Sequence, residues 1–271
     1  MLITVDTGGT KTLIASFNQD GVLGTSIKFP TPPDQSEYMA TLRQTLREYF
    51  SFDTVDAIVV ALPGRIDTNQ ELVLARNLHW RNFNVQAELG VDFDCPILVE
   101  NDANLAGLAA ARQLPEPVRT CLYVTVSTGI GTGLIVNGHI DDDYRQSEGG
   151  QIVLEHDGRL QRWENFASGR AIRETYGLYA SEITDPAAWK AIAQNISRGF
   201  LALLPILRPD IVVIGGSIGT YFDKYSDFLI DNLKEQLHYI PPIVAAVRPE
   251  EAVIYGCYYY ALDTLGAAVT A

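Results

Sequence analysis

Two stretches of the chain share one pattern of short apolar runs separated by glycine-rich turns. Runs of this length with turn residues between them predict β-strands joined into hairpins. The expected strands cover residues 2–6, 12–18 and 22–29 in the first stretch and residues 120–127 and 132–137 in the second. The turns lie at residues 7–11 and 128–131. Each half of the chain is therefore expected to begin with a β-hairpin.

The segments that follow these hairpins alternate between helical and extended patterns. Tyr38, Leu42 and Leu46 recur at four-residue spacing, which predicts a helix over residues 35–49. A nearly continuous apolar run at 55–62 predicts a strand that is covered on both faces. The other expected strands are 97–100 and 211–214, and the other expected helices are 102–111, 166–176, 186–207, 222–237 and 251–268, with 141–165 left as a polar stretch. Strands that alternate with helices predict an α/β fold.

The two hairpins also share sequence. Residues 4–10, Thr-Val-Asp-Thr-Gly-Gly-Thr, resemble residues 125–132, Thr-Val-Ser-Thr-Gly-Ile-Gly-Thr, once one inserted isoleucine is allowed. A chain of 271 residues is long enough for two modest domains. We therefore expect a duplicated fold with domains 1–103 and 104–271, and leave open that the last helix packs back on the first domain.

Composition and charge limit the possible partners. The chain carries 33 acidic and 20 basic residues, a net charge of -13, so a nucleic-acid-binding surface is not expected. Asp6 comes before any apolar run long enough for a signal peptide, and no uncharged stretch approaches the ~18 residues that span a bilayer. Cys95, Cys121 and Cys257 are odd in number and lie in apolar surroundings, which favours buried free thiols. We expect a soluble, cytoplasmic protein that binds neither nucleic acid nor membrane.

Three glycine-rich turns each follow an apolar strand, at residues 6–11, 127–133 and 215–219. Glycine lets backbone N–H groups approach phosphate oxygens, and threonine and serine hydroxyls add further donors. None of the three turns has the spacing of a Walker A loop or of a dinucleotide-binding turn. One such turn alone is more often an ordinary tight turn, but three of them at strand ends favour a nucleotide site.

Six segments, taken in order, resemble motifs of the ROK family of sugar kinases. They are residues 6–12, 100–104, 127–133, 148–150, 164–169 and 214–217. The resemblance implies a duplicated ribonuclease-H-like fold, as in the actin-like ATPases, with a cleft between two domains. It also implies an enzyme that uses ATP and Mg²⁺ to phosphorylate a hydroxyl of a hexose or an amino sugar, and a homodimer.

The resemblance assigns roles to single residues. Contacts with ATP are implied for Asp6, Gly8, Gly9, Thr10, Lys11, Thr128, Gly129, Gly131, Gly215 and Gly216. A sugar pocket is implied for Gly64, Arg65, Asn77, Asn101, Asp102, Glu148, Gln151 and Glu164. Asp102 would be the catalytic base, because a sugar hydroxyl must lose its proton as it attacks the γ-phosphoryl group. The alternative is that Asn101 or Asp102 only caps the helix that follows, although capping and catalysis are compatible.

The chain departs from the family at Gln151. Most members have a histidine at this position, which binds a structural zinc together with cysteines that follow it. No cysteine lies between residues 121 and 257 of this chain. Such a site needs four nitrogen or sulfur ligands, so we expect no zinc. The segment 152–164 should instead be held by packing of Trp163 and Phe166.

Other functions are less favoured by the sequence. His156 and the acidic run 141–143 are expected to be surface or packing features rather than metal ligands. A sugar- or nucleotide-binding sensor without turnover stays open as an alternative, since relatives of the ROK kinases include transcriptional repressors. Repressors of this type carry a helix-turn-helix before the kinase-like part, whereas the first phosphate turn here comes at Thr7, so DNA binding is not expected. A nucleotide-gated interaction protein would need a partner-binding domain that 271 residues do not accommodate.

Overall fold

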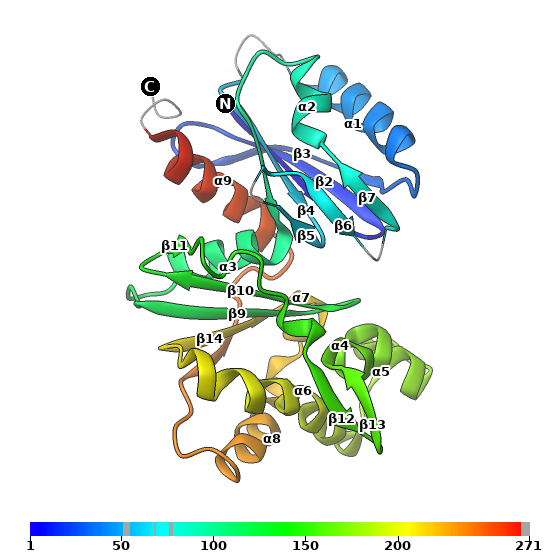
Figure 1. The fold of residues 1–271 in the computed structure, drawn as a ribbon, viewed down its shortest axis with the longest axis vertical. Coiled ribbons are helices and arrows are strands. Elements are labelled where there is room, and N and C mark those ends of the chain that lie inside the picture. The colour runs from blue at the N-terminus through cyan, green and yellow to red at the C-terminus, as the bar shows by residue number, and fades with distance from the viewer. Residues whose placement is uncertain (51–54, 68, 76–77, 267–271) are drawn as a thin grey trace. The chain divides into compact units, whose positions relative to one another are not determined.

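The computed structural model describes residues 1–50, 55–67, 69–75 and 78–266. The chain divides into two compact units, Met1–Ala109 with the segment from Val253 onward, and Ala110–Ala252. Each unit is a mixed α/β structure built around a five-stranded sheet (Figure 1).

The elements of the first unit are β1 (Leu2–Thr7), β2 (Lys11–Phe17), β3 (Leu23–Pro30), α1 (Gln35–Tyr49), β4 (Ala57–Leu62), β5 (Arg65–Ile66), β6 (Leu72–Ala75), β7 (Trp80–Phe83), α2 (Val85–Gly90), β8 (Ile97–Asn101), α3 (Asp102–Arg112) and α9 (Ala252–Leu265). Those of the second unit are β9 (Thr120–Val126), β10 (Ile130–Val136), β11 (His139–Ile140), η2 (Gly149–Gln151), β12 (Val153–His156), β13 (Arg159–Arg162), α4 (Trp163–Ala167), α5 (Gly169–Tyr176), η3 (Ala180–Glu182), α6 (Pro186–Leu207), β14 (Ile211–Gly215), α7 (Gly216–Gly219), α8 (Phe222–Lys234) and β15 (Ile243–Ala245).

The two five-stranded sheets have the same topology. The strand order is β3-β2-β1-β4-β8 in the first sheet and β11-β10-β9-β14-β15 in the second. In each sheet the first three strands form an antiparallel meander, and the last three run parallel to one another. This repeated arrangement confirms that the fold is duplicated.

The first five-stranded sheet contributes to two packed layers, because the side chains of each strand alternate between its faces. Ile3 and Val5 join the buried cluster formed with α1 and α2, on the face where Figure 1 shows those helices. On the opposite face α9 packs through aromatic residues, with the ring centroids of Tyr255 and Tyr258 lying 5.2 and 5.1 Å from that of Phe17. The last helix therefore packs with the first unit, although it follows the second along the chain.

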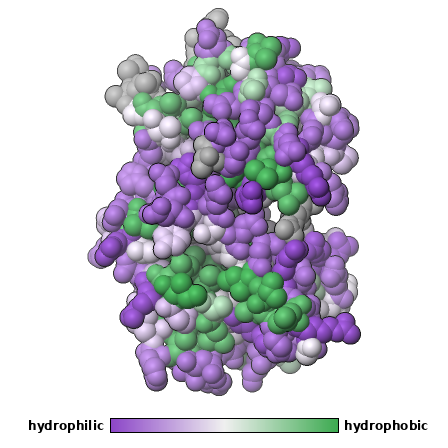
Figure 2. All heavy atoms as spheres, in the orientation of Figure 1, coloured by the Kyte–Doolittle hydropathy of each residue, from purple (hydrophilic) through white to green (hydrophobic). Residues whose placement is uncertain are grey.

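The second unit has its core between its sheet and the helices α6 and α8. Leu122 and Val124 of β9 are buried there with Ile196 and Phe200 of α6. Apolar side chains also gather on the surface of this unit (Figure 2). Ile206, near the end of α6, is largely exposed. Among the described residues, no helix combines the length and the apolar character needed to cross a membrane.

Several regions differ from the sequence-based expectation, and the following ones have a clear physical reason. The polar stretch expected at 141–165 contains the hairpin β12–β13, whose turn residues Asp157 and Gly158 both have positive φ, 50° and 74°, as two-residue hairpin turns require. The helix expected at 166–176 is divided at Ser168, whose hydroxyl accepts the Ala171 N–H at 3.3 Å and caps α5. Strands β5, β6 and β7 were not expected, because runs of two to four residues carry little periodic signal.

Candidate active site

Three parallel strands of the first unit end side by side, and each leads into a predicted site residue. In the register of the sheet, Asp6 on β1 pairs with Ala61 on β4, and Ala61 pairs with Glu100 on β8. Gly64 follows β4, and Asp102 follows β8. The carboxyl ends of parallel strands are where α/β sheets bind their ligands. The structure thus brings the predicted residues of this unit to one edge of its sheet.

Asp6 and Asp102 have carboxyl groups whose pKa values are both raised. Burial is the main cause that raises the pKa of Asp6 to about 7, the charge of Asp102 adds to the rise, and Lys28 opposes it. Burial also raises the pKa of Asp102 to about 6, against the effect of the hydrogen bond from the Ala103 N–H. Interacting carboxyl groups with raised pKa values are typical of active sites, where a base needs a pKa near the working pH.

Asn101 provides most of the cap of α3. Its Oδ1 atom accepts the N–H groups of Ala103 and Asn104 at 2.9 and 3.0 Å, whereas Asp102 Oδ1 accepts the Ala103 N–H at 2.8 Å. The Asn101 Nδ2 atom donates to the Gly64 carbonyl oxygen at 2.8 Å. Gly64 has a φ of 99°, and a Cβ at this position would lie 2.2 Å from a carbonyl oxygen of β6. Asn101 therefore fixes both the start of α3 and the glycine turn after β4.

The first glycine-rich turn joins β1 to β2. It is closed by a hydrogen bond from the Gly8 N–H to the Lys11 carbonyl oxygen at 3.0 Å. The three residues after Gly8 are exposed, so a ligand can reach them. Thr7, directly before the turn, is buried, and its hydroxyl oxygen lies 2.7 Å from that of Tyr38. The turn is therefore anchored at its base and open at its tip.

In the second unit, glycines from distant parts of the sequence contact the backbone at or beside the turn between β9 and β10. The Gly169 N–H donates to the Ser127 carbonyl oxygen at 2.6 Å. A Cβ on Gly150 would lie 1.9 Å from the Ile130 carbonyl oxygen, and one on Gly216 would lie 2.6 Å from a carbonyl oxygen of β9. Only glycine allows backbone segments to approach this closely.

Gln151 and Glu164 form a polar pair in the second unit. The Gln151 Nε2 atom donates to Glu164 Oε1 at 2.8 Å. The Oε1 atom of Gln151 is buried and accepts no hydrogen bond from the described residues. Glu148 is exposed just before the short helix η2 that ends at Gln151. The pair therefore contains one buried acceptor that no group in the described part of the chain satisfies.

The predicted site residues form two groups, one on each unit. The first unit carries Asp6, Gly8, Gly9, Thr10, Lys11, Gly64, Arg65, Asn101 and Asp102, and the second carries Thr128, Gly129, Gly131, Glu148, Gln151, Glu164, Gly215 and Gly216. Asn77 lies outside the described residues. Gly169 was not among the predicted site residues, although its place at the end of the motif 164–169 is a signal that could have marked it.

Trp163 and Phe166 hold the segment that follows Gln151. Trp163 is fully buried, and a Cβ on Gly199 of α6 would lie 2.0 Å from its ring. The Trp163 Nε1 atom donates to the Asn195 carbonyl oxygen at 3.3 Å, and Asn195 Nδ2 donates back to the Phe166 carbonyl oxygen at 3.2 Å. The His156 ring stacks on Phe166 with centroids 4.2 Å apart. These contacts confirm the predicted anchors and the packing role of His156.

We expect the purified protein to contain no stoichiometric zinc and to keep its fold after chelation. In the described part of the chain, no three His, Cys, Asp or Glu residues are grouped as a metal site requires. Elemental analysis, and thermal unfolding before and after dialysis against a chelator, measure this directly. About one zinc per chain, together with unfolding on chelation, would contradict the expectation and point to a metal-anchored segment.

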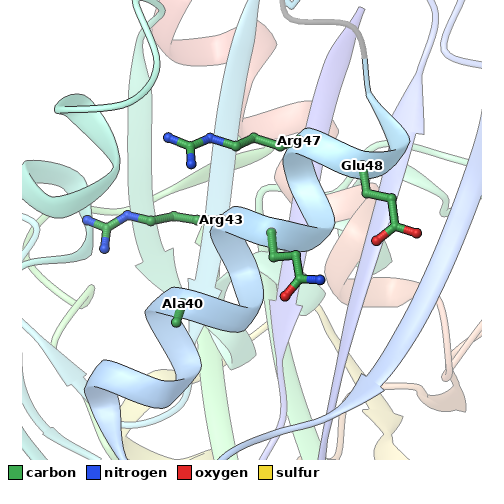
Figure 3. Close-up of a pocket in the computed structure, with 5 residues that line it drawn as sticks. Ala40, Arg43, Arg47 and Glu48 are labelled. Atoms are coloured by element: carbon green, nitrogen blue, oxygen red, sulfur yellow. The ribbon is translucent and has the colours of Figure 1, made fainter.

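A shallow pocket on the outer face of α1 lies apart from the predicted site residues. It has a volume of about 550 Å³ and is lined by Ala40, Arg43, Gln44, Arg47 and Glu48 (Figure 3). The two arginines extend to the same side of the helix (Figure 3), where Arg43 Nε and Arg47 Nη2 lie 2.6 and 2.5 Å from the carboxylate of Asp92. Glu88 Oε2 also lies 3.3 Å from Arg43 Nη2, so Asp92 and Glu88 together offset the charge of the two arginines. This pocket is therefore a poor phosphate site.

Comparisons with known proteins agree with the arrangement of the motifs. The sequence model of the ROK family matches residues 2–257. A fructokinase of Lactococcus lactis subsp. cremoris is 24% identical over 233 residues, which are 79% of this chain and 78% of the relative. An N-acetylmannosamine kinase of Vibrio cholerae is 26% identical over 244 residues, 80% of this chain and 84% of the relative.

A solved structure with the same fold supports the architecture. The crystal structure of a ROK family glucokinase from Streptomyces griseus, in complex with glucose and AMPPNP, matches with a TM-score of 0.82. The match covers 96% of this chain and 98% of that chain at 20% identity. This likeness confirms the expected fold class.

Proposed function

Because the chain belongs to the ROK family, we propose that it is an ATP-dependent kinase that phosphorylates a hydroxyl of a hexose or an amino sugar. The observation that carries this proposal is the pair of interacting carboxyl groups, Asp6 and Asp102, at the ends of parallel strands. The fructokinase and N-acetylmannosamine kinase among its relatives support the class of substrate.

Asp102 acts as the general base for the attacking sugar hydroxyl. With a pKa raised to about 6, its carboxyl group is mostly ionised at neutral pH and is a stronger base than an ordinary aspartate. Phosphoryl transfer leaves the protein little covalent chemistry to perform, so holding the hydroxyl in line with the γ-phosphorus is the larger task. Asn101 assists by fixing the start of α3, from which Asp102 extends.

The phosphates of ATP bind to backbone N–H groups of the turns 8–11 and 128–131, and Gly215 and Gly216 approach the adenosine. Mg²⁺ bound with ATP neutralises charge on the phosphate oxygens. Asp6 fits such an ion, because Mg²⁺ prefers carboxylate and water oxygens. A cation near Asp6 would also favour the ionised form of a carboxyl group whose pKa is otherwise raised to about 7.

The sugar hydroxyls bind to polar groups among the predicted site residues. These are Gly64, Arg65, Asn77, Asn101, Asp102, Glu148, Gln151 and Glu164. Carboxylates accept hydrogen bonds from hydroxyls, whereas carboxamides both donate and accept. Gln151 takes the place of the histidine that most family members have. It can still form a hydrogen bond with a sugar hydroxyl, although it binds no zinc.

Gln151→Ala should weaken sugar binding by about 1–3 kcal/mol, the cost of leaving one buried polar partner unpaired. Isothermal titration with the sugar that gives turnover measures this change. Gln161→Ala is the matched control, because Gln161 lies on β13 and its Nε2 atom donates to the His156 carbonyl oxygen at 3.2 Å. Unchanged sugar affinity in Gln151→Ala would place the sugar away from this residue.

The proposal is tested by measuring ADP release from MgATP across a panel of hexoses, N-acetylated amino sugars and anhydro sugars. Release that depends on one sugar, or on a small group of related sugars, supports the kinase and identifies its substrate. A protein that binds sugar and nucleotide but releases no ADP would instead be a sensor. Failure to bind any member of the panel would contradict the proposal.

A further inference from the structure

Thr31, directly after β3, holds two carbonyl groups of the first glycine-rich turn. Its N–H donates to the Thr10 carbonyl oxygen at 3.0 Å. Its hydroxyl donates to the Gly8 carbonyl oxygen at 2.8 Å. One residue outside the turn therefore fixes the orientation of two peptide groups within it.

A second hydroxyl holds Thr31 in place. The Oγ1 atoms of Thr12 and Thr31 lie 2.9 Å apart. Because the single hydroxyl proton of Thr31 is donated to Gly8, Thr12 is the donor in this bond. Both side chains are buried, which limits competition from water for the hydrogen bond between them. The hydroxyls form a chain that runs from Thr12 through Thr31 to the turn.

This arrangement sets the direction of two N–H groups. In a trans peptide unit the C=O and N–H groups point in opposite directions. The N–H groups of Gly9 and Lys11 belong to the same peptide units as the carbonyl groups of Gly8 and Thr10. With both carbonyl groups turned toward Thr31, these two N–H groups point away from it, on the exposed part of the turn. Fixed N–H groups of this kind bind phosphate oxygens.

We propose that Thr31 is a positioning residue for the phosphates of ATP, and that it acts by holding the carbonyl groups of Gly8 and Thr10 so that the N–H groups of Gly9 and Lys11 face the phosphates. The proposal rests on the proposed function, because it assumes that this turn binds ATP. Thr31 itself does not contact the nucleotide.

The test compares three variants of the full-length protein. Thr31→Val keeps the shape of the side chain but removes the hydroxyl, whereas Thr31→Ser keeps the hydroxyl. Thr4→Val is the matched control, because Thr4 is buried in the same sheet and its hydroxyl donates to the Ala15 carbonyl oxygen at 3.1 Å, away from the turn. Affinities for MgATP and for adenosine, which lacks phosphates, are measured for each protein, with KM for MgATP and for the sugar.

Thr31→Val should weaken MgATP binding by about tenfold, the usual effect of one lost buried hydrogen bond, while adenosine affinity and KM for the sugar change by less than about twofold. Thr31→Ser should stay within about threefold of the wild type. Thr4→Val should lower the thermal midpoint without changing the ratio of MgATP to adenosine affinity. If Thr31→Val does not fold, Thr12→Val, which removes the donor to Thr31, should give a smaller shift in the same ratio.

The inference is overturned if Thr31→Val, or Thr12→Val in its place, keeps the wild-type ratio of MgATP to adenosine affinity. A wild-type protein that binds MgATP but phosphorylates no sugar would refute the proposed function alone, and the affinity ratios would still decide on Thr31. A wild-type protein that binds no nucleotide would overturn both.

Discussion

Asp102→Asn should lower the rate of sugar phosphorylation by about 10²–10⁴-fold, the usual effect of removing a general base. MgATP affinity should stay nearly unchanged, because Asp102 is assigned to the sugar hydroxyl rather than to the phosphates. Steady-state kinetics and nucleotide titration separate these effects. Asp94→Asn, at an exposed position of the same unit, is the control and should retain wild-type turnover. A folded Asp102→Asn protein with near-normal turnover would contradict the assignment.

The raised pKa of Asp102 makes two further properties of this variant measurable. Wild-type kcat/KM should rise with pH through about 6, as the carboxyl group becomes ionised, and the residual activity of the variant should lack this step. The folded state binds the proton more tightly than the unfolded state, whose pKa is near 3.8, so ionisation of Asp102 lowers stability as pH rises from about 4 to about 6. Asp102→Asn should therefore be more stable than the wild type above pH 7, by on the order of 2–3 kcal/mol. If the stability difference between Asp102→Asn and the wild type is the same at neutral and at acidic pH, ionisation of Asp102 carries no such penalty.

Trp163→Ala should lower the free energy of unfolding by about 3–5 kcal/mol, as expected for truncating a fully buried tryptophan. It should also raise KM for the sugar more than KM for MgATP, because Trp163 directly precedes Glu164, the partner of Gln151. Denaturant unfolding and two-substrate kinetics measure both effects. Leu160→Ala is the control, because Leu160 lies in the same segment but is exposed.

A small effect of Trp163→Ala on both stability and sugar KM would mean that other contacts hold the segment. Gly199→Ala tests the packing of Trp163 against α6 by changing the other side of the contact. A Cβ there would lie 2.0 Å from the Trp163 ring, so this small addition should also be destabilising.

Elements with strong local signals could be predicted from the sequence. Helix α1 runs over Gln35–Tyr49 as expected, because Asp34 caps its start and its apolar residues recur at helical spacing. Helix α6 also matches the expected range, since Asp185 caps it and Pro186 suits its first turn. The glycine-rich turns predicted the strand ends at which the candidate site residues lie.

Contacts between distant segments could not be predicted in this way. Nothing local to Asn101 indicates that its Nδ2 atom holds the Gly64 carbonyl group, because that contact exists only once β4 and β8 are parallel neighbours. The fit of Trp163 against Gly199 similarly joins a short helix to a distant one. Hairpin β12–β13 was missed because its strands are short and mostly polar, so that only its Asp157-Gly158 turn carries a local signal.

We expect this chain to transfer the γ-phosphoryl group of ATP to a sugar hydroxyl. Phosphorus NMR of the wild-type protein with MgATP and each sugar of the panel tests it most directly, because the products are seen without coupling enzymes. A sugar phosphate signal should grow in equal amount with ADP, and Asp102→Asn should slow the formation of both together. ADP that accumulates only with inorganic phosphate, or ATP that stays intact with every sugar, would contradict it.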